Sequence, residues 1–148
     1  MCRLKTVLAE PEPQFAAVAV LVAFGSMMPR FSILDTGNSQ TIIPKSLAQQ
    51  LQMPLTPGSD KDHFYWHSGS AIPEFGRCPL TFVANQEGQD LTLQAEVRVV
   101  EGWTLPPLLG MRGYLEKIRF AIDPIVASTE DNQAGYFLFG EVGSGRRR

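Results

Sequence analysis

The sequence reads Phe-Ser-Ile-Leu-Asp-Thr-Gly-Asn-Ser from Phe31 to Ser39, so an apolar run leads directly into an acid, a hydroxyl and a glycine. The apolar residues predict a strand that ends at Leu34. We expect Gly37 to take a backbone turn that other residues resist, which leaves Asp35 at the tip of that turn beside a buried interior. A carboxylate costs free energy there unless a partner stabilises it, and such a placement is typical of functional acids. Asp-Thr-Gly by itself is equally compatible with an ordinary turn, so the rest of the chain has to decide.

Composition narrows the class of protein. The chain has 148 residues, of which 44% are hydrophobic and 19% charged, and this predicts one domain with a hydrophobic core. The net charge of −2 argues against a nucleic-acid partner. Cys2 and Cys78 form neither a disulfide framework nor a metal cluster, and we expect no cofactor and no metal. This cysteine usage fits a reducing, cytoplasmic compartment.

The longest apolar run is Phe15–Phe24, which is too short to span a bilayer as a helix. We interpret it as a buried strand; the alternatives are a signal-peptide core or a membrane anchor, because basic residues precede it. Residues 1–13 are expected to form a flexible arm, residues 14–141 the folded domain and residues 142–148 a disordered basic tail.

The segment after Asp35 continues with a short strand at Thr41–Ile43. Pro44 then opens a helix at its favoured first position. Leu47 and Leu51 lie four residues apart on one face of that helix and predict its buried side.

An aromatic segment, His63–His67, rises to small residues around Gly69 and predicts a hairpin with a mobile end. The two histidines are four residues apart, a spacing that would suit a metal on a helix. The aromatic neighbours favour a strand instead, and no third ligand is evident, so we do not predict a metal site here.

A second informative stretch spans Leu105–Phe120. An apolar strand ends at Gly110, and a short helix follows with Leu115 and Ile118 on one face. Together these elements predict a mainly β protein, a closed barrel with one or two short helices. The remaining predicted strands are Pro79–Val83, Leu91–Val100, Phe120–Asp123 and Tyr136–Phe139.

Two of these features together resemble the single-domain, retroviral-type (retropepsin-like) aspartic proteases and their bacterial relatives. The first is the Asp-Thr-Gly sequence at Asp35, followed by a short strand and a helix. The second is Leu108-Leu109-Gly110, some seventy residues further on, followed by a short helix and a strand. The resemblance covers about residues 15–140 and implies an acid-protease barrel that hydrolyses peptide bonds.

The resemblance also implies roles for single residues. Asp35 matches the catalytic aspartate, Thr36 the hydroxyl residue that braces the paired active-site loops, and Gly37 the turn glycine near the carboxylates. Leu109 and Gly110 match the strand that supports the catalytic loop. The flap and pocket positions over the substrate correspond to Trp66, His67, Ser68, Gly69, Ser70, Ile72 and Leu108.

Hydrolysis by carboxylates needs two of them, one to take a proton from water and one to donate a proton to the carbonyl oxygen. No other aspartate of this chain precedes Thr-Gly or Ser-Gly. We therefore predict a homodimer in which Asp35 meets its own copy across a two-fold axis, with a peptide or protein as substrate. The family implies that Tyr136–Phe139 contributes to the shared sheet.

Some positions depart from the family pattern. Asn38 replaces the usual Ala or Ser, the hairpin tip has Gly69 as its central glycine and is unusually aromatic, and Arg112 replaces an acid that is frequent in relatives. The alternative function is accordingly a non-catalytic barrel used for peptide binding or dimerisation. Ile42, Ile72 and Leu108 are candidate pocket walls, with ordinary core positions as the alternative.

Overall fold

The central hairpin forms as predicted. The computed structural model describes residues 2–12, 15–84, 89–123 and 133–141. β2 (Phe15–Phe24) pairs antiparallel with β3 (Arg30–Leu34), and β3 ends directly before Asp35. The apolar run at Phe15–Phe24 is therefore a strand, as we interpreted it.

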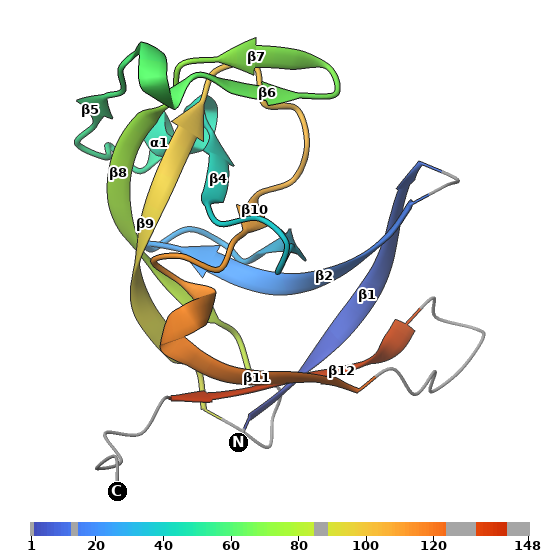
Figure 1. The fold of residues 1–148 in the computed structure, drawn as a ribbon. Helices are drawn as coiled ribbons and strands as arrows, with labels where there is room; N and C mark the ends of the chain where they lie inside the picture. The colour runs from blue at the N-terminus through green and yellow to red at the C-terminus, as the bar shows by residue number, and fades with distance from the viewer. Residues whose placement is uncertain (1, 13–14, 85–88, 124–132, 142–148) are drawn as a thin grey trace, which may run out of the picture.

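Six strands close into a barrel. β3 is followed around the ring by β10 (Leu108–Leu109), β4 (Thr41–Pro44), β9 (Leu91–Val100) and β8 (Glu74–Phe82). β8 then pairs with β2 and completes the ring. The predicted mainly β, closed barrel is confirmed, and Figure 1 shows its curved wall of β8 and β9.

The N-terminal segment differs from our expectation. We expected a flexible arm over residues 1–13, but Cys2–Glu12 forms β1, which pairs with β2 on one side and with β12 (Gln133–Glu141) on the other. β12 also pairs with β11 (Ile118–Asp123). β11 and β12 lie at the end of the barrel away from β6 and β7, and β1 rises from that end to meet β2 (Figure 1). The predicted tail at residues 142–148 lies outside the described residues.

Helical structure is sparse. α1 (Lys45–Gln50) begins after Pro44, which is its N-cap and not, as expected, its first helical residue. The helix predicted after Gly110 is a single 3-10 turn, η2 (Leu115–Lys117). No helix in the described part of the chain is long and apolar enough to cross a membrane. The other short elements are β5 (Thr56–Pro57), η1 (Asp60–Asp62), β6 (Phe64–Trp66) and β7 (Gly69–Ala71).

Buried side chains form two clusters on opposite faces of the sheet near β10. The main core fills the barrel and includes Leu109 and Tyr114, and Leu34 packs against it. A smaller cluster contains Ile42 and Leu108. Because neighbouring residues of a strand point to opposite faces, Leu108 and Leu109 reach different clusters.

Candidate active site

Asp35 lies where β3 ends, and its backbone is fixed by β10. The two strands are parallel, with Leu108 beside Ile33 and Leu109 beside Leu34. The ladder continues one residue further, because the N–H of Asp35 donates to the carbonyl of Leu109 over 3.0 Å. The position of the acid therefore depends on residues more than seventy positions away, as the family resemblance implied.

The turn after β3 is closed by local hydrogen bonds. The N–H of Gly37 donates to Asp35 Oδ1 over 3.1 Å, and the N–H of Asn38 donates to the Asp35 carbonyl over 3.2 Å. Asp35 is half-buried, whereas Thr36 and Gly37 are exposed. The N–H of Gly37 thus fixes the orientation of the Asp35 carboxylate within the turn.

Our reason for Gly37 was wrong. Among the described glycines, a positive φ occurs at Gly25, Gly102 and Gly113, and not at Gly37. A Cβ at position 37 would lie 3.4 Å from Asp35 Oδ1. The backbone conformation at Gly37 is thus open to other residues, and a side chain there would border the carboxylate.

Asn38, which stands where the family usually has Ala or Ser, supports the turn. Its Oδ1 accepts the N–H of Gln40 over 2.9 Å, which is a local side-chain turn of the kind that Asn favours. Its carbonyl accepts the N–H of Met111 over 2.9 Å. The departure from the family pattern at Asn38 therefore leaves the backbone around Asp35 intact.

Gly110 and Thr41 interlock the two segments of the site. The buried Thr41 Oγ1 accepts the N–H of Gly110 over 3.1 Å. A Cβ on Gly110 would overlap the backbone of Gln40, lying 2.7 Å from its nitrogen and closer still to its carbonyl. Gly110 is needed here because two backbones approach closely. Thr41 was missed as a site residue, although a threonine at the start of an apolar strand is a usable signal.

Side-chain alternation places Asp35 on one face of the sheet. Ile33, Leu108 and Ile42 are register partners on neighbouring strands, and paired residues share a face. Asp35 follows two residues after Ile33 and belongs to the same face. Leu34, between them, packs against the main core on the other face.

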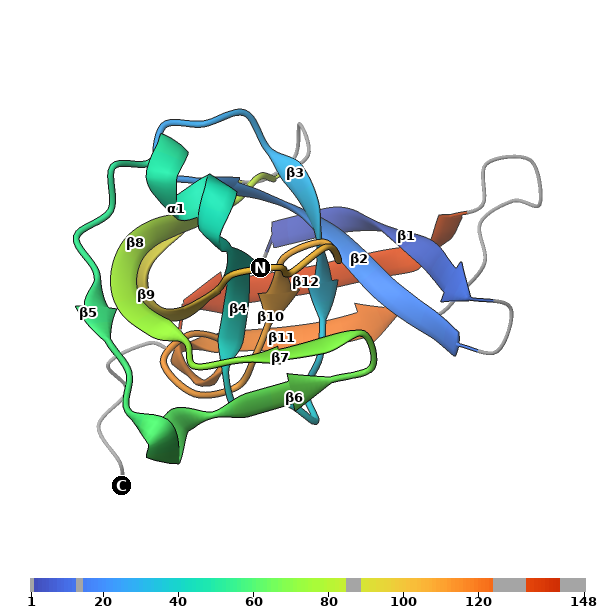
Figure 2. The ribbon, with the colours of Figure 1, turned by 90° about the horizontal axis from the view of Figure 1, so that it is seen from above.

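The predicted flap is a hairpin of β6 and β7, with Trp66 opposite Gly69. It lies at the top of the barrel above β4 and β10 (Figure 1), and β3 runs toward it in the view from above (Figure 2). The indole Nε1 of Trp66 donates to Ser68 Oγ over 3.0 Å. A Cβ on Gly69 would lie 2.8 Å from the indole ring, so this glycine leaves room for Trp66. His67 and Ser70 are exposed.

Aromatic contacts join the flap to the loop before β10. Trp66 meets Trp103 edge-on with ring centroids 5.6 Å apart, and Phe64 lies 6.2 Å from Trp103. Trp103 donates its indole N–H to the carbonyl of Pro106 over 3.1 Å. Leu108 packs against this same cluster, so the structure brings the flap and Leu108 together. Sequence reasoning missed Trp103, whose position in a loop gave no indication of its partners.

The other residues that the sequence analysis singled out have different surroundings. Ile42 is fully buried in the flap-side cluster and is a core residue, not an open pocket wall. Ile72 is 45% exposed beside β7. His63 contacts the neighbouring Tyr65, whose hydroxyl lies 3.2 Å from its Nδ1.

Comparison with known structures identifies the fold. No protein-family model and no curated protein matches the sequence. The crystal structure of a retropepsin-like aspartic protease from Rickettsia conorii matches 93% of this chain and 90% of its own, with a TM-score of 0.54 and 16% identity. The fold is retropepsin-like. The retroviral protease-like domain of Ddi1 from Leishmania major matches 86% of this chain and 97% of its own, with a TM-score of 0.48 and 15% identity.

The candidate site is built around one carboxylate, that of Asp35. Asp35 is partly accessible, and the exposed Thr36 and Gly37 border it. A half-buried carboxylate can bind and polarise water, but acid–base hydrolysis requires a second proton-carrying group.

Proposed function

We propose that this protein is an aspartic endopeptidase whose active site is completed when Asp35 of two copies come together in a homodimer. The observation that carries the proposal is the position of Asp35. It directly follows β3, is fixed to β10 by the Leu109 carbonyl, and belongs to the sheet face that carries the smaller cluster with Ile42 and Leu108.

The mechanism requires two carboxylates that share one proton, since two such groups a few ångströms apart do not both ionise readily. One Asp35 accepts a proton from water, and its copy donates a proton to the carbonyl oxygen of the peptide. Gly37 holds each carboxylate through its N–H. Thr36, exposed beside Asp35, is available to contact the partner's loop.

The flap supplies the binding surface. A peptide bound in extended form between the hairpin and β10 places alternate side chains toward opposite walls. Trp66 and Leu108, which pack in one cluster, form the apolar side of that surface. Closure of the hairpin over the peptide excludes water from the reacting carbonyl.

Cleavage of a peptide library from acidic to neutral pH tests the activity. We expect cleavage by the wild type and none by Asp35→Asn, which keeps the shape of the side chain but cannot act as a base. Asp60→Asn is the matched control, because Asp60 is an exposed aspartate in η1. Equal activity of the Asp35 variant and the wild type would refute the proposal.

Subunit mixing tests the shared site. When wild-type and Asp35→Asn chains are mixed equally and allowed to exchange, about a quarter of the dimers contain two wild-type chains. Activity per wild-type chain then falls to roughly half. An unchanged activity per wild-type chain would show that one chain suffices.

The rival function, a non-catalytic peptide-binding module, predicts a different result. Peptides would bind to wild type and to Asp35→Asn with equal affinity, and neither protein would cleave them. The sequence features that favoured this rival were Asn38 and the unusually aromatic flap. The Asn38 side chain closes the local turn through Gln40 and makes no described hydrogen bond to the carboxylate of Asp35.

A further inference from the structure

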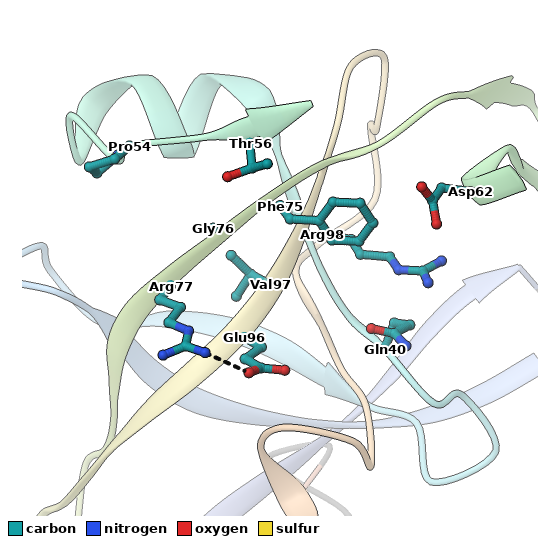
Figure 3. A pocket seen from close by; sticks show the side chains of 10 residues that line it. All are labelled: Gln40, Pro54, Thr56, Asp62, Phe75, Gly76, Arg77, Glu96, Val97 and Arg98. Atoms are coloured by element: carbon teal, nitrogen blue, oxygen red, sulfur yellow. Dashed lines mark hydrogen bonds and ion pairs between the residues drawn. The ribbon is translucent and has the colours of Figure 1, made fainter. Parts of the chain in front are cut away.

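A pocket lined by polar and charged residues reaches the turn that follows Asp35. It encloses about 650 Å³ between the outward face of β8 and β9 and the segment that leads from α1 to the flap. Its lining includes Arg98 from β9, Phe75 from β8 and Gln40 from the turn that follows Asp35. Figure 3 shows the Arg98 side chain extending past the Phe75 ring toward the side where Gln40 and Asp62 lie.

Arg98 is held in place but incompletely bonded. Its guanidinium carbon lies 5.5 Å from the centre of the Phe75 ring, a cation–π contact that fixes the side chain. Its Nε is buried and has no hydrogen-bond partner among the described residues. A guanidinium group has five N–H donors, and a planar carboxylate is the partner that it binds through two of them at once.

The sheet register connects this pocket to Asp35. The pairing runs from Ile33 to Leu108, from Leu108 to Ile42, and from Ile42 to Arg98. Register partners share a face, so Arg98 lies on the same face as Ile33 and Asp35. Gln40 is two residues before Ile42 and belongs to this face as well.

The separation suits an extended peptide. Arg98 is three strands away from β3, which at about 4.8 Å per strand amounts to roughly 14 Å, the length of about four extended residues. The arginine and the acidic side chain each extend from their own backbone, and this shortens the stretch of peptide that is needed. We therefore expect the guanidinium to meet a residue about two to four positions from the cleaved bond.

The other charges of the pocket are already engaged. Arg77 and Glu96 pair with each other over 3.1 Å. The Asp62 carboxylate accepts the backbone N–H of Ser59 over 2.9 Å and its hydroxyl over 3.2 Å. Asp62 still carries a negative charge, and it opposes binding of a second carboxylate.

We propose that the Arg98 pocket binds a carboxylate of the peptide substrate and so gives the protease a preference for an acidic side chain two to four residues from the cleaved bond. This inference rests on the proposed function. Because a homodimer has two such pockets related by its two-fold axis, the preference applies on both sides of that bond.

Matched peptides test the inference. The peptides have blocked ends and are compared in pairs by kcat/KM. Within a pair, one peptide has Glu and the other has Gln at one position, which lies two to four residues from the bond on either side. We expect Glu to be favoured about tenfold at one position on each side. A further peptide has Gln at all of these positions and a free C-terminal carboxylate. It shows whether the pocket binds the carboxylate of a chain terminus or that of an acidic side chain.

Three variants assign the effect to Arg98. Arg98→Gln is expected to abolish the preference, and Asp62→Asn to increase it because a repelling charge is removed. The double variant Arg77→Gln/Glu96→Gln removes a cation of the same pocket together with its partner, and is expected to leave the preference unchanged.

The outcomes separate this inference from the proposed function. Cleavage with a Glu-to-Gln ratio below twofold at every position overturns the pocket assignment and leaves the protease intact. If no peptide is cleaved, the proposed function fails, and binding of the same peptides, followed by the fluorescence of Trp66 and Trp103, decides on the pocket. Equal affinity for Glu and Gln peptides then overturns it, whereas a preference lost in Arg98→Gln supports it.

Discussion

Gly110 is the position where the structure makes its most definite stability prediction. Its N–H is bound by Thr41, and an added Cβ would lie 2.7 Å from the Gln40 nitrogen and nearer to the Gln40 carbonyl. Real Cβ atoms essentially never lie closer than 3.0 Å to such atoms. Because the obstacle is backbone, a rotamer change does not relieve it, and the Gly110→Ala variant has to separate β10 from the turn after Asp35.

The cost follows from two contributions. Overpacking of a well-packed site costs about 1–3 kcal/mol, and loss of the buried hydrogen bond from Gly110 to Thr41 adds roughly 1 kcal/mol. We therefore expect Gly110→Ala to lose about 3 kcal/mol of unfolding free energy and about 6–12 °C in Tm. Urea denaturation followed by tryptophan fluorescence measures the first quantity, and calorimetry measures the second.

Gly37→Ala is the matched control. It is a glycine of the same site, and its nearest contact would be a side-chain oxygen at the ordinary distance of 3.4 Å. We expect a loss of less than about 1 kcal/mol, as for exposed substitutions without strain. If Gly110→Ala proves as stable as Gly37→Ala, the close approach of β10 to the Asp35 turn is wrong.

Three further predictions concern the site and the main core. Thr41→Val leaves the buried N–H of Gly110 unpaired and is expected to cost about 1–3 kcal/mol of unfolding free energy, measured by urea denaturation. Thr41→Ser is the control because it keeps the acceptor oxygen. An equal loss of stability in the two variants would contradict the prediction. Burial raises the pKa of the Cys78 thiol from its ordinary value of 9.0 to about 11, so the folded state holds this proton more firmly. Stability is then complete below pH 9 and declines as the pH rises toward 11, and Cys78→Ala should lessen that decline in pH-dependent calorimetry. Trp66→Ala removes the ring contact with Trp103, worth roughly 1 kcal/mol, and should accelerate amide hydrogen exchange in the flap about fivefold; unchanged exchange would show that the cluster does not hold the hairpin.

Local patterns were sufficient for the elements that carry the candidate site. An unbroken apolar run predicted the β2 strand, and the change from apolar residues to Asp-Thr-Gly located the end of β3 at Leu34. The aromatic segment around Gly69 predicted the flap hairpin in the same way. These features depend on residues close in sequence, because strand propensity and turn chemistry act over a few positions.

Other features had no local signal. The prolines and charges of residues 1–13 suggested an arm, but pairing with β2 and β12 makes Cys2–Glu12 a strand. Arg98 reads as the outward residue of an alternating strand, and nothing adjacent to it indicates the Phe75 ring or the turn after Asp35. Such contacts arise from the order of strands around the barrel.

The sequence by itself determined that an acid follows an apolar strand and that a second apolar-glycine segment lies some seventy residues later. Only the tertiary structure decided how these two segments meet, with β10 inserted between β3 and β4 and Gly110 against the backbone of Gln40. The physical reason is that strand pairing is set by hydrogen bonds and burial between distant residues, whereas periodicity and turn propensity report only on near neighbours.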